Sequence, residues 1–116
     1  MNHHHHINYI EIPASSIDAS KQFFTKVFEW QFIDYRPDYA SFLNAGIDGG
    51  FWRNDMTAQT VSGSVLVVLY TSDLEATLAK VKAAGGVIIK PIFSFPGGRR
   101  FQFLDPSQNE FAVWSE

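Results

Sequence analysis

The stretch Phe93-Ser-Phe-Pro-Gly-Gly-Arg-Arg-Phe-Gln-Phe-Leu-Asp-Pro-Ser-Gln-Asn-Glu-Phe-Ala-Val-Trp114 carries the clearest information about the fold. Apolar residues occupy every second position on both sides of its centre, which is the two-residue period of a β-strand with two distinct faces. Between these runs, Asp105-Pro-Ser-Gln-Asn109 is typical of a turn, because Pro presets φ and the Asp and Asn side chains bond to nearby backbone. We therefore predict two strands joined by a tight turn.

The rest of the chain repeats one pattern twice. In the first half we expect a strand at 7–12, a helix at about 17–29, and short strands near 30–35, 39–44 and 47–53. In the second half we expect a strand at 64–70, a helix from Leu74 that ends at Gly85-Gly86, a strand at 87–93 and the closing hairpin. The polar segment 54–63 has the composition of a linker.

The two helices also begin alike. Ser16-Ile-Asp-Ala-Ser20 corresponds to Asp73-Leu-Glu-Ala-Thr77, so each helix has a capping residue at its start. We therefore predict an α+β fold built from two tandem βαβββ modules, at about 7–55 and 64–116, preceded by a His-containing tail at 1–6. A single module would leave one sheet face open, whereas two modules can form a curved sheet around a cavity with the helices outside.

Composition limits the possible functions. The chain has 116 residues, enough for one domain, and 46% of them are hydrophobic. A formal net charge of −3 without a basic stripe argues against a nucleic-acid partner. No apolar run approaches the roughly 18 residues of a membrane span, no signal peptide is visible, and Cys is absent. These features favour a cytoplasmic protein without a membrane partner.

Histidine occurs only at His3–His6. The chain from Ile7 onward lacks His and Cys, so a Ser-His or Cys-His nucleophilic site is excluded from the body of the domain. A transition-metal site would have to use carboxylates or the terminal tract. That tract is either native or an expression remnant, and His-rich tracts bind metals adventitiously.

Several sequence segments resemble those of the vicinal oxygen chelate superfamily, which includes glyoxalase I, extradiol dioxygenases, and bleomycin- and fosfomycin-resistance proteins. The likeness lies in the duplicated βαβββ plan and in three phrases: Ile10-Glu-Ile-Pro13 leading into Ala19-Ser-Lys-Gln-Phe-Phe-Thr-Lys-Val-Phe-Glu-Trp30, Asp73 to Gly86, and Leu104-Asp-Pro-Ser-Gln-Asn-Glu-Phe111. It covers essentially the whole chain from Ile7. At Gln108 the superfamily commonly has Gly, a departure that affects turn geometry.

The resemblance also implies where a metal would bind. Metal-containing members usually place a ligand on the first strand of each half and a carboxylate on the last, and these positions correspond here to Tyr9, Val67 and Ala112. The last strand of the first half, Gly49-Gly-Phe-Trp52, also lacks an acid. Val and Ala have no donor atom for a divalent ion. We therefore expect no metal and no other cofactor at this site.

Strand alternation predicts which residues share the cavity. We expect the cavity-facing residues, and hence the ligand-binding set, to be Tyr9, Glu11, Trp52, Val67, Leu69, Arg100, Glu110, Ala112 and Trp114. Glu11 and Glu110 are the catalytic candidates as acid and base; alternatively they lie at the cavity mouth or pair with Arg99 or Arg100. Adjacent strand residues face opposite ways, so at most one of these two arginines enters the cavity.

Aromatic residues make up 16% of the chain and include eleven Phe. They either fill the core or line an apolar pocket or a subunit interface; Trp30, Trp52 and Trp114 are candidates for stacking on a flat ligand. The leading hypothesis is metal-independent binding of a small apolar or aromatic molecule by a homodimer. The alternatives are a lyase or isomerase of the glyoxalase type, using carboxylates or a relocated metal, and a non-catalytic partner subunit.

Overall fold

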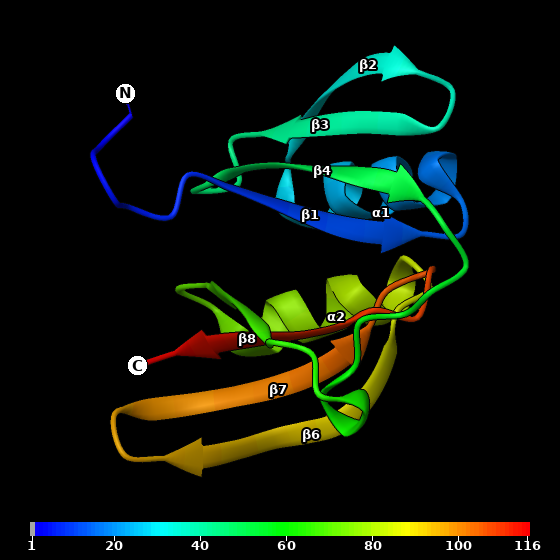
Figure 1. Cartoon of the computed structure of the whole chain (residues 1–116). Coiled ribbons are helices and arrows are strands. Elements are labelled where there is room, and N and C mark those ends of the chain that lie inside the picture. The colour runs from blue at the N-terminus through cyan, green and yellow to red at the C-terminus, as the bar shows by residue number, and fades with distance from the viewer. Residues whose placement is uncertain (1) are drawn as a thin grey trace. The chain divides into compact units, whose positions relative to one another are not determined.

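The computed structural model describes residues 2–116 and contains eight strands and two α-helices (Figure 1). In chain order these elements are β1 (Tyr9–Ala14), α1 (Ile17–Phe28), β2 (Gln31–Arg36), β3 (Tyr39–Leu43), β4 (Asp48–Arg53), β5 (Val67–Tyr70), α2 (Leu74–Ala83), β6 (Val87–Phe95), β7 (Gly98–Leu104) and β8 (Glu110–Ser115). A single turn of 3₁₀-helix, Thr60–Ser62, lies between β4 and β5. The predicted succession of elements is confirmed.

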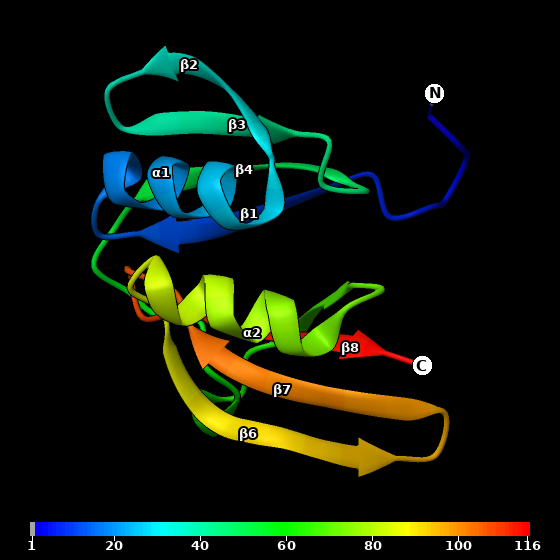
Figure 2. The same cartoon turned by 180° about the vertical axis from the view of Figure 1, so that it is seen from behind.

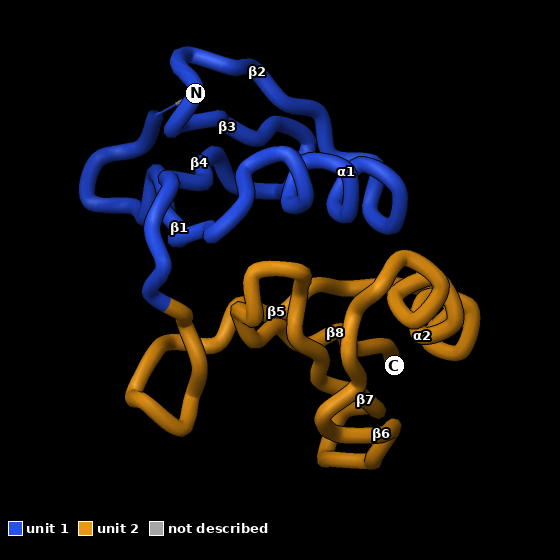
Figure 3. Tube along the Cα trace, turned by 90° about the vertical axis from the view of Figure 1, so that its right-hand side faces the viewer, with its two compact units in different colours: residues 1–56 blue, residues 57–116 orange. Residues whose placement is uncertain are grey.

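The chain divides into two compact units, residues 1–56 and 57–116 (Figure 3). Each contains one four-stranded sheet, with strand order β1-β4-β3-β2 in the first and β5-β8-β7-β6 in the second. The first strand of each unit pairs in parallel with the last, and the other pairings are antiparallel. The two sheets therefore have the same topology, which confirms the duplicated βαβββ plan.

Unit 1 has its core between α1 and one face of its sheet. The Ser16 side chain caps α1 by accepting a hydrogen bond from the amide of Ala19 at 3.1 Å. Trp30 is buried, and its ring lies 4.6 Å from that of Phe24 on α1 and 4.6 Å from that of Phe42 on β3. Trp30 therefore belongs to this aromatic core and is not a candidate for ligand stacking.

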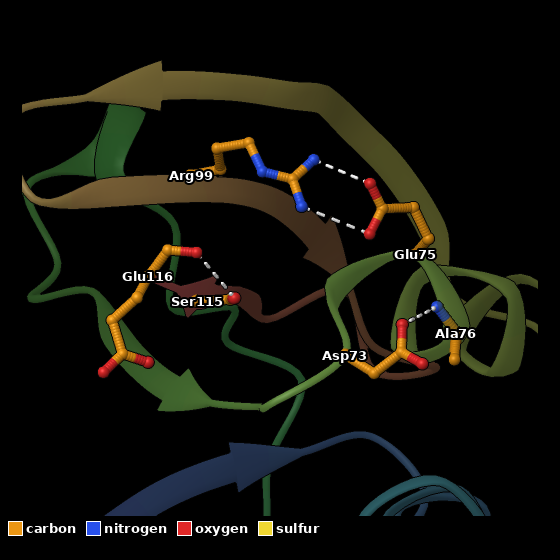
Figure 4. Close-up of polar contacts among 6 residues, drawn as sticks. All are labelled: Asp73, Glu75, Ala76, Arg99, Ser115 and Glu116. Carbon is orange, nitrogen blue, oxygen red and sulfur yellow. Dashed lines mark hydrogen bonds and ion pairs between the residues drawn. The ribbon is translucent and has the colours of Figure 1, made fainter.

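Unit 2 repeats the arrangement, with α2 along one face of its sheet (Figure 2). Asp73 caps α2 by accepting a hydrogen bond from the amide of Ala76 at 3.1 Å (Figure 4). The chain leaves the helix through Gly85, whose φ of 97° is accessible to glycine at little cost. The buried apolar side chains of this core include Leu74, Val81, Phe101, Phe103, Phe111 and Val113.

The turn between β7 and β8 is organised by Asp105. Its Oδ1 accepts hydrogen bonds from the backbone amides of Ser107 at 2.9 Å and Asn109 at 2.8 Å, while its own amide donates to the carbonyl of Asn109 at 2.9 Å. Gln108 has a φ of 64°, in the left-handed region that favours glycine. The Gly-to-Gln departure therefore falls at the position where glycine would fit with least strain.

Two expectations about the second half need correction. Strand β5 begins at Val67, so residues 64–66 are not part of the strand. The expected linker is not free of unit 2: the Ala58 amide donates to Asn109 Oδ1 at 2.8 Å, and the Ala58 carbonyl accepts from the Glu110 amide at 2.8 Å. These bonds hold the segment against the start of β8, because they satisfy polar groups that would otherwise be buried unpaired.

Within residues 2–116, neither helix has the length and apolar character needed to cross a membrane; α1 has 12 residues and α2 has 10.

The turn makes a testable contribution to the pH dependence of stability. Burial raises the pKa of Asp105 from 3.8 to about 6, although hydrogen bonds from Asn109 and Ser107 oppose the change. The folded state therefore binds this proton more tightly, so the stabilisation is complete below pH 3.8 and is lost as the pH rises through about 6. A difference of about two pH units corresponds to about 3 kcal/mol.

We expect Asp105→Asn to remove this loss. Between pH 4 and pH 7, the free energy of unfolding of the wild type should fall by up to about 3 kcal/mol relative to that of the variant, measured by urea denaturation. Asp48→Asn, at an exposed position, is the control and should follow the wild type. Parallel pH profiles for the wild type and Asp105→Asn would contradict the assignment.

Candidate functional site

Each sheet has one face packed on its helix and one face turned away from that helix. In unit 2 the two adjacent arginines mark these faces. Arg99 forms an ion pair with Glu75 of α2, with Nη1 and Oε2 2.7 Å apart (Figure 4). Because successive residues of a strand point to opposite faces, Arg100 lies on the face turned away from α2. The sequence left open which of the two arginines faces away from the helix, and that residue is Arg100.

Four large side chains form a row across the open face of unit 2. Tyr70 pairs with Trp114, Trp114 with Arg100, and Arg100 with Phe93, so one member comes from each of β5, β8, β7 and β6. The rings of Tyr70 and Trp114 are 5.2 Å apart, and Phe95 adds a third ring 6.3 Å from Trp114. We call Tyr70, Phe93, Phe95, Arg100 and Trp114 the aromatic-arginine row.

The register of β5 corrects the predicted positions of Val67 and Leu69. These two residues pair with the core residues Phe111 and Val113, so they lie on the face that packs on α2. Val68 and Tyr70 lie instead beside Ala112 and Trp114 on the open face, and they are 44% and 54% exposed. The predicted alternation was off by one residue, and a shift by one reverses every side chain of a strand.

The Arg100 guanidinium lies against aromatic rings. Its central carbon is 5.2 Å from the ring centre of Phe93 and 5.8 Å from that of Phe95, within cation–π range. Its Nε is buried and has no hydrogen-bond partner within residues 2–116. The protein thus contacts this cation through aromatic rings and leaves its buried Nε without a hydrogen-bond acceptor.

Glu110 lies on the same face as Trp114 but is tied to the protein. Its Oε1 accepts hydrogen bonds from the amide and the hydroxyl of Thr60, both at 2.8 Å, and its Oε2 accepts one from Gln102 Nε2 at 2.6 Å. Burial acts to raise the pKa of Glu110, but these hydrogen bonds outweigh it and hold the pKa below its ordinary value. Glu110 is therefore a buried, ionised anchor for residues 58–60, and it pairs with neither Arg99 nor Arg100.

Unit 1 presents a different surface on its open face, a cluster of hydroxyl groups beside a carboxylate. The Tyr9 hydroxyl lies 2.5 Å from the Tyr39 hydroxyl and 3.0 Å from the Ser41 hydroxyl, and Tyr39 donates a hydrogen bond to Glu11 Oε2 at 3.1 Å. Burial, together with the hydrogen bonds to Tyr9 and Glu11, raises the pKa of Tyr39 above its ordinary value. The Tyr39 phenol thus keeps its proton at neutral pH and donates a hydrogen bond to Glu11.

A glycine makes room for this cluster. Gly50 pairs with both Glu11 and Ser41 in the sheet, and a Cβ atom at Gly50 would lie only 2.4 Å from the Tyr39 hydroxyl oxygen. Trp52 borders the cluster, because it pairs with Tyr39 on the same face. The hydroxyl cluster therefore depends on a missing side chain at its centre.

The two catalytic candidates, Glu11 and Glu110, belong to different units and have unlike surroundings. Glu11 is exposed and accepts one hydrogen bond from a phenol, whereas Glu110 is buried and both of its oxygens are occupied. The sequence did not single out Tyr39, Tyr70, Phe93, Phe95 or Gln102. Alternation along β7 from Arg100 is the signal that would have indicated Gln102, whereas Phe93 shares a face with Arg100 only through the register of β6 against β7.

Two of the three positions that the resemblance associates with metal ligands offer no donor atom. These are Val67, which lies on the α2 face of β5, and Ala112, on the open face of β8; both side chains carry only carbon atoms. No group of three or more His, Cys, Asp or Glu side chains suited to a metal ion occurs within residues 2–116. The residues present therefore do not fit the metal that the resemblance associates with these positions.

One further hollow lies elsewhere in unit 1. A groove of about 710 Å³ runs between α1 and β2, and its lining includes Lys21, Lys26 and Trp30. Lys21 is engaged there with Asp34, with Nζ 2.8 Å from Oδ1. Of the residues considered for ligand contact, this groove contains Trp30 alone, whose ring is buried in the core of unit 1.

Comparison with known proteins gives a consistent result. A model of the glyoxalase/bleomycin resistance protein/dioxygenase superfamily matches residues 6–113. Comparison with curated proteins gives no significant match.

Solved structures with the same fold cover nearly the whole chain. A glyoxalase-related enzyme from Fulvimarina pelagi has 17% identity and a TM-score of 0.80, with 97% of this chain and 88% of that chain covered. The fosfomycin resistance protein FosX from Listeria monocytogenes has 17% identity and a TM-score of 0.78, with coverage of 96% and 93%. TioX from Micromonospora sp. ML1 has 18% identity and a TM-score of 0.71, with coverage of 95% and 98%.

Because Glu11 and Glu110 have different surroundings, replacing each with alanine should change the free energy of unfolding by different amounts. Glu110→Ala leaves the Thr60 amide and the Gln102 side chain without their acceptor, so we expect the free energy of unfolding to fall by about 2–3 kcal/mol. Glu11→Ala, at an exposed site, should change it by no more than about 0.5 kcal/mol. Urea denaturation of both variants checks this, and equal effects would contradict the anchoring role of Glu110.

The role of Gly50 can be tested with a double-mutant cycle. Gly50→Ala should cost about 1 kcal/mol in the free energy of unfolding, because the Tyr39 ring must turn away and lose its hydrogen bonds. In a Tyr39→Ala background the same substitution meets no obstacle and should be neutral or stabilising. Additive effects in the cycle would show that Gly50 and Tyr39 do not interact.

Proposed function

Because the chain belongs to the glyoxalase/bleomycin resistance protein/dioxygenase superfamily, we propose that it binds a small aromatic organic molecule, without a metal ion, on the open face of the unit 2 sheet. The observation that carries this proposal is the aromatic-arginine row. Ligand sites are characteristically apolar and aromatic surfaces with a few polar groups that fix orientation. The row combines four rings with one cation in this way.

The rings of the row are accessible as well as apolar. Tyr70 is more than half exposed, and Trp114, Phe93 and Phe95 are half-buried. An aromatic ligand stacked on Trp114 would cover the rings and remove apolar surface from water, which contributes about 25 cal/mol per Å² of apolar area. Offset or edge contacts between aromatic rings add about 0.5–1.5 kcal/mol beyond that area.

One observation supports binding without a metal. Val67 and Ala112, the unit 2 positions that the resemblance associates with metal ligands, have side chains of carbon atoms only, where a metal site would need oxygen or nitrogen donors. A fosfomycin resistance protein is among the solved structures of this fold, one of which is a complex with Mn(II), and it supports a small organic molecule as the ligand class but not the absence of a metal. Function does not follow from fold, and the proposal therefore depends on the row itself.

The rival proposal, an enzyme that uses two carboxylates, has less support. A general acid or base must have a free position from which to exchange a proton with the substrate. Both oxygens of Glu110 are engaged by protein donors, and its lowered pKa disfavours the protonated form. Glu11 alone, with Tyr39 bound to it, would have to carry the chemistry.

The proposal predicts stabilisation by aromatic ligands. In a thermal-shift screen of naphthalene, quinoline and indole derivatives, we expect some members to raise the Tm by mass action, with and without EDTA. Trp114→Ala should weaken binding about tenfold, the effect of losing about 1.4 kcal/mol of stacking. Isothermal titration of the strongest ligand measures this directly.

Tyr35→Ala is the control, because Tyr35 is an exposed aromatic residue of β2 that is not among the predicted ligand-binding residues. It should leave the affinity unchanged. A flat screen, loss of binding on chelation, or full affinity in Trp114→Ala would each overturn the proposal.

A further inference from the structure

We propose that the ligand carries an anionic group, most simply a carboxylate attached to an aromatic ring, and that Arg100 is the residue that selects it. This inference rests on the proposed function, since it names the chemical class of the molecule bound at the aromatic-arginine row. The carboxylate would pair with the guanidinium while the ring stacks on Trp114.

The first argument is the use of arginine in this chain. Of its four arginines, Arg36, Arg53 and Arg99 form ion pairs with Asp38, Asp55 and Glu75. Within residues 2–116, Arg100 is the only arginine that forms no ion pair, and the groups around its guanidinium are aromatic rings. A guanidinium held in a fixed orientation without a protein anion is suited to receive one from a ligand.

The second argument is that the carboxylates on this face have other partners. Glu110 is bound by Thr60 and Gln102, and Glu116 accepts a hydrogen bond from the Tyr70 hydroxyl. A second cation, Lys90, pairs with Gln102 in the sheet and lies close enough to Glu110 to lower its pKa. Both acids thus have other hydrogen-bond donors, and neither forms an ion pair with Arg100.

The third argument is geometric. Neighbouring strands of a sheet are about 4.8 Å apart, so a group on β8 and its partner on β7 are separated by little more than the width of an aromatic ring. Arg100 and Trp114 are such partners. A ring stacked on Trp114 would thus place a carboxylate substituent beside the guanidinium, whose central carbon also lies 5.2 Å from the ring centre of Phe93 and 5.8 Å from that of Phe95.

The experiment compares two molecules of the same shape, 2-naphthoate and 2-naphthamide, by isothermal titration. We expect the wild type to bind the naphthoate at least tenfold more tightly, and we expect this preference to decline with added salt. Arg100→Gln should abolish the preference while leaving binding of the amide unchanged. Arg100→Lys should keep part of it, because lysine supplies the charge without the two-donor fork.

Arg99→Gln is the matched control, because Arg99 is the adjacent residue but lies on the α2 face in an ion pair with Glu75. It should keep the full preference for the naphthoate. Equal binding of acid and amide by the wild type would overturn the inference and leave the proposed function intact. Failure of both molecules, and of the wider aromatic panel, to bind would overturn the proposed function as well. The wild-type comparison decides the question even if Arg100→Gln does not fold.

Discussion

The structure depends on one constraint, the alternation of side chains along strands that have a helix on only one face. Arg99 and Arg100 show its effect most directly. One residue apart, they lie on opposite faces of β7, and they have entirely different partners: a carboxylate of α2 for Arg99 and two aromatic rings for Arg100. The helix-side arginine contributes an exposed ion pair of small energetic value. The other is left on the face that α2 does not cover.

The same constraint acts on both units, but the two sequences fill their open faces with different chemistry. Unit 1 carries hydroxyl groups that bond to one another and to Glu11, with Gly50 leaving the space they occupy. Unit 2 carries rings and a cation. Because the topology is identical, this difference comes from side chains alone, and the two modules present surfaces of different chemistry.

Most of the fold could be predicted from the sequence because its signals are local. Caps such as Ser16 and Asp73, the glycine stop and the Asp105 turn act within a few residues. The faces of β8 were also predictable, since the core residues Phe111 and Val113 lie two positions apart and Glu110 lies next to Phe111. In β5 they were not: Val67-Val-Leu-Tyr70 is apolar throughout, so only its register against β8 shows that Val68 and Tyr70 lie on the open face.

The surroundings of Glu110 could not be predicted for a further reason. Its alternation places it correctly on the open face, but its partner Thr60 is fifty residues away in a segment with the composition of a linker. Once that segment docks, the carboxylate that the sequence offered for catalysis becomes part of the scaffold. Burying a charge is tolerable only when it is fully hydrogen-bonded, and Thr60 and Gln102 meet that requirement for Glu110. Within residues 2–116, the Nε of Arg100 has no such hydrogen-bond partner, and so the charged group on this face that lacks a partner in the protein is a cation.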